Sequence, residues 1–277
     1  MTAYNYLISS GWWCDESSHG EDRTNRFGDQ QIRGRDFHQL WYRCIKRFTN
    51  PGAIYIVDSA SPTTPILHED EIFVHLQKNF GHSTNCTERL GGFVRAVSLG
   101  MYYAYINDFE YWVYIEQDAL VFGDGLVERC IDFMRQYRCP ILFGDGRGTP
   151  QPIQQSFMLM HKDAIMPFLY GIDRIRASDR EISPEWKYSI AANSLLRLIP
   201  EGIFRGILSP SKHGRIIRSI TRRLMSAAAT IGKKYRYLPI GYGRARPIQF
   251  NDSHFYFQHG TREELDRFME KLDAANG

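Results

Sequence analysis

The sequence predicts an α/β protein whose Rossmann-like, mixed and mostly parallel sheet is flanked by helices. Strand-like apolar runs alternate with helical patterns along the first half of the chain, which is the order of a parallel sheet. The runs at 53–57 and 111–115 are almost continuously apolar, as expected of strands that are buried on both faces. Acidic residues follow both runs closely, at the strand ends where open α/β sheets place their ligands.

The first half of the chain is expected to fold as strand, helix, strand, strand, helix and strand. Apolar residues recur at helical spacing through 36–48, and the helix should end before Asn50-Pro51-Gly52. The polar loop before it, 14–35, is longer than most connections, which indicates a functional or mobile segment. The expected elements are strand 4–13, helix 36–48, strands 53–57 and 71–76, helix 87–106 and strand 111–122.

The second half of the chain contains two helix starts with clear capping signals. Ser183 and Pro184 suit the N-cap and the first helical position, and Thr261 with Glu264 forms a capping box. The expected elements are helix 126–137, strands 140–143 and 156–160, helices 163–170 and 184–198, extended segments 237–247 and 250–258, and helix 261–272. Without a repeat or linker, we expect one domain, 1–277, with halves at 1–125 and 126–277.

Composition limits the class of protein. With 277 residues and 43% hydrophobic content, the chain can bury a substantial core, and a net charge of +3 gives no reason to expect a nucleic-acid partner. Five scattered cysteines without a C-x-x-C pair argue against a disulfide framework and favour a reducing compartment. No cleavable signal and no apolar run near the ~18 residues of a membrane span appears. We therefore expect a cytoplasmic protein that can associate with a membrane surface.

The segment 197–236 is strongly basic. It contains ten arginine and lysine residues against a single acid, Glu201, with apolar residues interleaved. Such a segment can lie peripherally on an anionic membrane or bind another polyanion. The alternative is a solvated helix pair that covers the sheet.

An acidic pair, Glu116 and Asp118, lies near the end of the expected strand 111–122. Two residues apart on an extended chain, both side chains would point to one face. Carboxylates are costly to bury unless they are paired, hydrogen-bonded or bound to a metal. The pair therefore indicates a divalent-cation site. The alternative is that the strand ends at Ile115 and the two acids are solvated.

The order of these features resembles the GT-A glycosyltransferases, and family two among them. The resemblance rests on Val57-Asp58-Ser59, on Asn79-Phe80-Gly81 and on the acidic pair, which is similar to the D-x-D motif with Glu in place of the first Asp. It implies a GT-A fold and a metal-dependent, inverting transfer of a sugar from a UDP- or GDP-sugar to a glycan or lipid-linked acceptor. The half 1–125 would bind the nucleotide sugar, and the half 126–277 the acceptor.

The resemblance also implies a Mn²⁺ or Mg²⁺ cofactor. Asp118 would be the direct ligand, and Glu116 would contact the ribose or a metal-bound water; the longer Glu side chain leaves its contacts open. His259 would be a further ligand, which suits Mn²⁺ better than Mg²⁺. The alternative for His259 is a strand-end histidine bonded to backbone.

The implied donor-binding and catalytic residues come from several segments. The candidates for the donor are Ser9, Ser10, Asp58, Asn79, Arg89, Arg244 and Arg246. A turn-capping role is the alternative for Asp58, and plain surface charge for Arg244 and Arg246. Glu185 is the first candidate for the general base, with Asp179 and Glu181 as rivals. Helix N-terminal acids that favour the helix dipole are the alternative for all three.

Two other functions remain open. A nucleotidyltransferase also uses an acidic pair on an α/β sheet, although Ser10-Gly11-Trp12-Trp13 stands where its Gly-rich, Arg-containing signature is expected. The second is a glycan- or membrane-binding module without catalysis.

Overall fold

A computed structural model describes residues 4–16, 28–83, 86–146, 149, 151–208, 227–228, 230–243 and 250–275. Within these ranges, seven strands form one sheet in the order β3-β2-β1-β4-β7-β6-β8. They are β3 (Glu71–His75), β2 (Ala53–Asp58), β1 (Tyr6–Trp12), β4 (Tyr111–Ile115), β7 (Ile153–His161), β6 (Ile141–Asp145) and β8 (Arg236–Tyr237). Strands β3, β2, β1 and β4 are parallel, and β7 is antiparallel to both β4 and β6. The mixed, mostly parallel sheet is confirmed.

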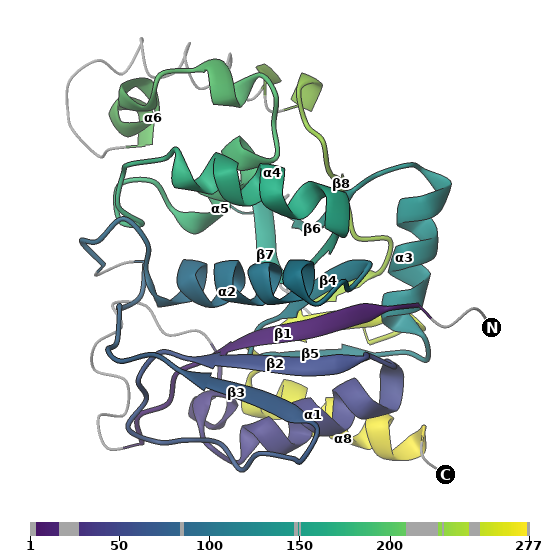
Figure 1. Ribbon diagram of the computed structural model, residues 1–277. Coiled ribbons are helices and arrows are strands. Elements are labelled where there is room, and N and C mark those ends of the chain that lie inside the picture. The colour runs from purple at the N-terminus through teal and green to yellow at the C-terminus, as the bar shows by residue number, and fades with distance from the viewer. Residues whose placement is uncertain are drawn as a thin grey trace.

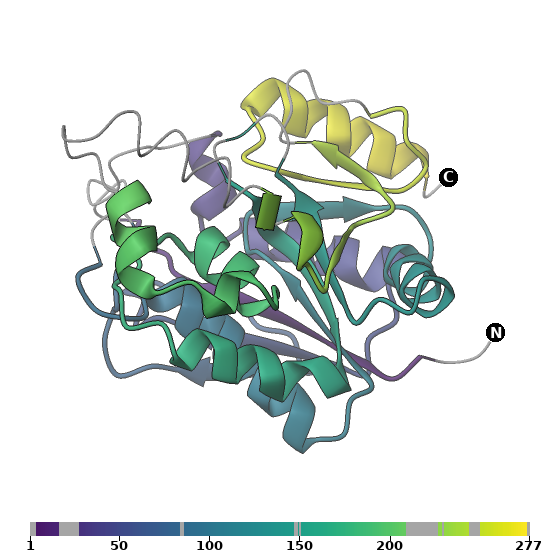
Figure 2. The ribbon, with the colours of Figure 1, turned by 90° about the horizontal axis from the view of Figure 1, so that it is seen from above.

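Helices cover both faces of this sheet (Figures 1 and 2). One face carries α2 (Gly92–Ile106), α4 (Lys162–Asp173) and α5 (Pro184–Ala191). The other carries α1 (Phe37–Phe48), α3 (Leu126–Gln136) and α8 (Arg262–Ala274).

The central strands supply side chains to two cores in alternation, because successive residues of a strand point to opposite faces. In β4, Trp112 and Tyr114 join the core under α2, whereas Val113 and Ile115 join the core under α1. All four are at most 1% exposed. Burial on both faces explains why these strands are apolar at every position.

A smaller sheet has the order β5-β10-β9 within the described residues. Its strands are β5 (Ala119–Phe122), β10 (Phe255–Gln258) and β9 (Gly241–Gly243). Strand β10 runs antiparallel to β5, with Gln258 opposite Ala119. This pairing returns the C-terminal part of the chain to the acidic pair.

The expected single strand 111–122 is wrong. The chain turns between β4 and β5: the Ala119 amide donates to the Glu116 carbonyl at 2.9 Å, and the Glu116 amide donates to Ser156 at 2.9 Å. Strand β4 stays in the large sheet while β5 enters the small one. Glu116 and Asp118 therefore share a turn and not one face of an extended strand.

The largest differences in helix boundaries are at α5 and α2. Helix α5 ends at Ala191, and a short 3₁₀ helix, η2 (Leu196–Leu198), follows. The Asn193 side chain accepts bonds from the amides of Leu195 and Leu196, both at 2.9 Å, and such local bonds compete with a continuing helix. Helix α2 starts at Gly92, five residues later than expected. The capping box of α8 is confirmed.

The basic segment is only partly within the described ranges, which include η2 and α6 (Glu201–Leu208) but not 209–226. In the described part, Leu198 and Ile231 are 79% and 78% exposed. None of the described helices combines the length and the hydrophobicity needed to cross a bilayer. All five cysteines are free and buried.

Candidate functional site

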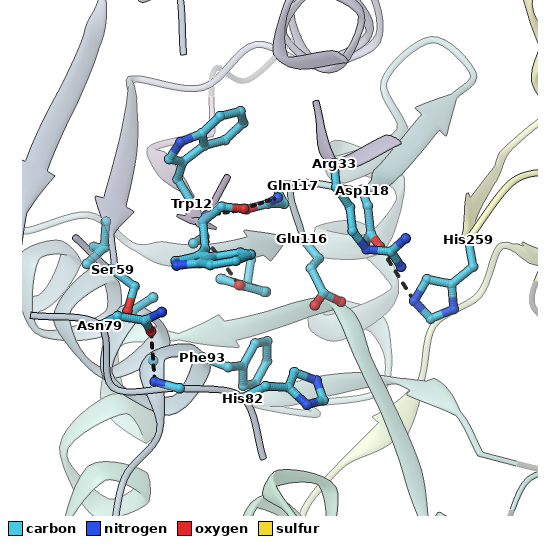
Figure 3. A pocket seen from close by; sticks show the side chains of 17 residues that line it. Trp12, Arg33, Ser59, Asn79, His82, Phe93, Glu116, Gln117, Asp118 and His259 are labelled. Atoms are coloured by element: carbon cyan, nitrogen blue, oxygen red, sulfur yellow. Dashed lines mark hydrogen bonds and ion pairs between the residues drawn. The ribbon is translucent and has the colours of Figure 1, made fainter. Parts of the chain in front are cut away.

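A pocket opens at the carboxyl ends of β1, β2 and β4 (Figure 3). From β1 the chain crosses through α1 to β2 on one side, and it later returns through α2 to β4 on the other side. The strand order thus reverses at β1, and open α/β sheets bind ligands at such a switch point.

Close backbone approaches shape this pocket. A Cβ atom on Gly92, the first residue of α2, would lie 2.7 Å from Ser59 Oγ, and one on Gly11 of β1 would lie 3.1 Å from the Cβ of Ala96 in α2. Glycine therefore lets the start of α2 approach the ends of β1 and β2. The N-terminus of a helix of this length favours negative charge in the adjoining pocket.

The acidic turn between β4 and β5 forms one wall of the pocket. The Gln258 side-chain nitrogen donates to Glu116 Oε2 at 2.5 Å and to Asp118 Oδ1 at 3.1 Å. The Gln258 oxygen accepts a bond from Ser156 Oγ at 2.6 Å. One buried amide on β10 therefore holds the two carboxylates beside each other.

Two further groups meet at the other oxygen of Asp118. Arg33 Nη2 lies 3.6 Å from Asp118 Oδ2, and His259 Nε2 lies 3.5 Å from the same atom. The Asp118 side chain is 6% exposed, against 19% for Arg33 and 15% for His259. In Figure 3, these three residues stand opposite Ser59 and Asn79.

The position of His259 depends on contacts between distant parts of the chain. His259 has a φ of +58°, which is uncommon for a residue other than glycine and is often found at functional sites. Gly28, with a φ of +81°, packs against it so closely that a Cβ there would lie 2.7 Å from the His259 carbonyl carbon. The Asp29 amide donates to the Gly260 carbonyl at 2.8 Å.

The middle residue of the acidic turn positions an aromatic residue. Gln117 accepts a bond from the Trp13 amide at 2.6 Å and donates to the Trp13 carbonyl at 3.0 Å. Both residues line the pocket, together with Phe93 and His82. Aromatic surfaces of this kind can accept a base or a sugar ring.

Among the expected donor-binding residues, Asn79 lines the pocket, where its side chain accepts a bond from the Gly81 amide at 2.8 Å. Ser9 and Ser10 are buried in β1 outside the lining, and Gly11, Trp12 and Trp13 line it instead. Ser9 Oγ accepts a bond from the Trp112 indole at 2.8 Å.

Asp58 and Arg89 are engaged elsewhere. Asp58 is fully buried and accepts bonds from the Ser61 amide and hydroxyl, with His75 beside it. This arrangement corresponds to the turn-capping alternative. Arg89 binds Asp173 at 2.7 Å and ties the loop before α2 to α4. Arg244 and Arg246 lie outside the described residues.

The three acids considered for the general base differ in environment, and none lines the pocket. Asp179 is 2% exposed and binds Lys187 Nζ at 2.6 Å and the Gly91 amide at 2.5 Å. Burial raises the pKa of Asp179 and lowers the pKa of Lys187. The exposed Glu181 accepts bonds from the amide and hydroxyl of Ser178. Asp179 is thus held in a buried ion pair, and Glu181 in a local turn with Ser178.

Glu185 is half-buried in the first turn of α5, three residues before the buried Tyr188. Burial raises the pKa of Tyr188 well above its usual value, and the negative charges of Asp179, Glu185 and Glu116 add to this rise. The Tyr188 ring packs 6.0 Å from that of Phe93, which lines the pocket.

The donor set at Asp118 fits a hard divalent cation. Within the described ranges, no three His, Cys, Asp or Glu side chains gather as a complete ligand set. Mg²⁺ and similar ions commonly take one or two protein ligands and complete their shell with substrate phosphates and water. Asp118 Oδ2 and His259 Nε2, 3.5 Å apart, approach the spacing of about 3 Å between adjacent octahedral ligands. An imidazole ligand suits Mn²⁺.

Sequence reasoning missed three residues of this site. Gln258 precedes His259, and its place in the strand pairing decides its role. Gln117 stands inside the acidic motif, where only the two acids drew attention. Arg33 belongs to the polar loop before α1 and has no local signal that marks it. Each depends on contacts between segments distant in the sequence.

Comparison with known proteins gives remote structural likenesses. No protein-family model matches the sequence, and no curated protein matches it either. A putative nucleotide-diphospho-sugar transferase from Desulfovibrio desulfuricans G20 is similar in structure, at 13% identity and a TM-score of 0.42, over 82% of this chain and 98% of that one. A putative glucose-1-phosphate thymidylyltransferase from Bacillus anthracis matches at 12% identity and a TM-score of 0.33, over 96% and 93%.

S. aureus TarS matches at 8% identity and a TM-score of 0.38, over 74% of this chain. The match covers 34% of the length of the TarS chain. All three identities are 13% or lower and all three TM-scores are 0.42 or lower, so these likenesses assign no function to this chain.

Proposed function

We propose that the chain is a metal-dependent glycosyltransferase that moves a sugar, with inversion, from a UDP- or GDP-sugar to a glycan or lipid-linked acceptor. The observation that supports this most is the meeting of Asp118 and His259 in a pocket at the strand-order reversal, beside the N-terminus of α2. This pocket offers a cation site, a helix terminus for phosphates and aromatic walls for a base or sugar.

Residues in and around the pocket have distinct roles in this proposal. Asp118 and His259 hold Mn²⁺ or Mg²⁺, and Gln258 keeps Glu116 beside them for the ribose or a bound water. When bound, the cation offsets the negative charge that develops on the departing diphosphate. Asn79 and the first turn of α2 face the donor, and Glu185 accepts the proton of the acceptor hydroxyl.

Binding of UDP and GDP with and without Mn²⁺, followed by calorimetry, tests the site. Asp118→Ala should weaken the Mn²⁺-dependent binding on the order of 100-fold, because it removes a direct ligand. Asp163→Ala removes a carboxylate that is 89% exposed on α4 and serves as the matched control. Unchanged binding by Asp118→Ala would refute the assignment.

The products separate the proposed reaction from the alternatives. A glycosyltransferase releases a nucleoside diphosphate from a sugar nucleotide, whereas a nucleotidyltransferase exchanges pyrophosphate into a nucleoside triphosphate. Pyrophosphate exchange without release of UDP or GDP would identify the second activity. A protein that binds no nucleotide at all would instead fit the binding module.

Glu185→Gln should slow transfer and leave donor binding unchanged.

A further inference from the structure

We infer that Arg33 and the divalent cation occupy the same oxygen of Asp118 in turn, and that metal binding releases the guanidinium to the diphosphate of the donor. This inference rests on the proposed function and adds a residue to it. It makes Arg33 a switch between two anionic partners, Asp118 and the donor.

The geometry at Asp118 supports this exchange. Gln258 occupies Oδ1 at 3.1 Å, while Arg33 and His259 both face Oδ2. A cation bound between Oδ2 and the His259 imidazole would lie against the Arg33 guanidinium, and two positive charges at such close range repel each other. Arg33 therefore has to leave Oδ2 when the metal binds.

The contact between Arg33 and Asp118 is suited to release. Arg33 Nη2 lies 3.6 Å from Asp118 Oδ2. A strong charge-assisted hydrogen bond from a cationic N–H group to a carboxylate is shorter, about 2.7–2.9 Å. Arg33 is the last residue of the 3₁₀ helix η1 (Gln30–Arg33), whose Ile32 is 1% exposed. The long side chain can thus move while its backbone stays anchored.

Contacts on both sides hold η1 over the pocket. Asp29 caps it by accepting a bond from the Gln31 amide at 2.9 Å, and Gln31 accepts a bond from Arg262 Nη1 at 3.0 Å. Arg262 opens α8, directly after the His259 turn. Arg33 and His259 are therefore carried by one packed unit, and both reach the same carboxylate.

The released guanidinium remains in the pocket, which Arg33 lines together with Asn79 and the start of α2. Its planar fork matches phosphate oxygens. When the metal binds alone, its affinity for Asp118 is lowered because it has to displace Arg33. When a nucleoside diphosphate binds with the metal, its phosphates offer the displaced Arg33 a new partner. Metal and nucleotide should therefore bind cooperatively.

Titration of the full chain with Mn²⁺ alone, read by electron paramagnetic resonance, tests the exchange. Arg33→Met removes the charge and keeps an apolar stem, so it should bind Mn²⁺ alone about tenfold more tightly than the wild type. With saturating Mn²⁺, it should bind UDP or GDP about tenfold more weakly. Arg43→Met, in an exposed arginine of α1, should change neither affinity. Thermal unfolding of each variant checks that it is folded.

Arg33→Lys keeps the positive charge without the fork. It should retain the weak binding of Mn²⁺ alone and lose part of the nucleotide affinity. If Arg33→Met and Arg33→Lys both bind Mn²⁺ as the wild type does, while nucleotide binding still depends on Asp118, the exchange is refuted and the proposed function stands. If the wild type shows neither Mn²⁺ nor nucleotide binding at this pocket, the proposed function fails, and the exchange fails with it.

Discussion

Glu116 and Asp118 share a single hydrogen-bond donor, the side-chain nitrogen of Gln258, at 2.5 and 3.1 Å. The two hydrogens of one amide thus hold two carboxylates that would otherwise repel each other. The amide is fixed from its far end by Ser156 Oγ at 2.6 Å. The spacing of the acids therefore depends on the pairing of β10 with β5 as much as on the turn that carries them.

Replacing Gln258 should disturb both stability and binding. In Gln258→Leu, each carboxylate loses a donor, and a hydrogen bond to a charged group contributes about 1.5–3 kcal/mol. We expect the free energy of unfolding to fall by about 2–4 kcal/mol and the Mn²⁺-dependent affinity for UDP or GDP to fall about tenfold or more. Urea unfolding and calorimetry measure the two effects.

Ser156→Ala is the control for this substitution. It removes the bond at the far end of the amide and leaves both carboxylate bonds in place, so it should cost about 1 kcal/mol of stability and little affinity. Equal nucleotide affinity in Gln258→Leu and the wild type would show that the amide does not position the acids.

The cysteine thiols should be slow to react in the native protein. All five are buried and free. Burial raises the pKa of Cys14 to about 11, and the negative charges of Glu16 and Asp15 contribute to this rise. Burial likewise raises the pKa of Cys44 to about 12. The thiolate is the reactive form, so at pH 8 the thiolate fraction of Cys14 is on the order of 100-fold below that of an ordinary thiol. Reaction should accelerate as the pH rises toward these values.

Labelling with a disulfide reagent at pH 8, before and after denaturation in guanidinium, measures this protection. All five thiols should react at once in the denatured chain and slowly in the native one. A native thiol that reacts as fast as free glutathione would contradict the buried placement of these residues. Cys14 follows Trp13 of the pocket wall, so bound nucleotide should slow its labelling further.

Much of the fold could be predicted because its signals are local. The apolar run of β2, the helical spacing of α1 and the capping box at Thr261 each lie within one short stretch of sequence. The sequence does not decide between a strand that ends at Ile115 and one that continues to Phe122, because Glu116-Gln117-Asp118 is flanked on both sides by apolar residues that suit a strand. In the structure, the Glu116 amide donates to the Ser156 carbonyl of β7, and the Ala119 amide then closes the turn on the Glu116 carbonyl.

The site was predictable only in part, because several of its residues are positioned by contacts between segments that are distant in the sequence. The structure brings Asp118 and His259 together, whereas the resemblance that suggested them says nothing of Gln258 or Arg33. Asp179 shows how tertiary contacts change the environment of a candidate residue. An acid near a helix start looks available, but its pairing with Lys187 appears only once the loop before α5 folds back.

The pair of Lys187 and Asp179 provides a last prediction. Lys187 is fully buried and donates to the carbonyls of Arg89 and Ala177 and to Asp179. Lys187→Met leaves the Asp179 carboxylate buried without its cation, and breaking a buried pair in this way costs about 3–5 kcal/mol. Lys187→Met with Asp179→Asn should lose less than the single variant, because no uncompensated charge remains.

The pH dependence of the single variant separates charge from packing. Burial raises the pKa of Asp179, and removing Lys187 raises it further, so the folded variant binds a proton more tightly than the unfolded chain does. The free energy of unfolding of Lys187→Met should therefore rise as the pH falls from 8 through the pKa of Asp179 in the folded variant. The rise should end near the usual pKa range of an aspartate, where the unfolded chain also takes up the proton. The double variant should lack this dependence. Urea unfolding at pH 8 and pH 5 measures both. A stability loss under about 1 kcal/mol, or one that is equal at both pH values, would contradict the prediction that Lys187→Met leaves an uncompensated charge buried at Asp179.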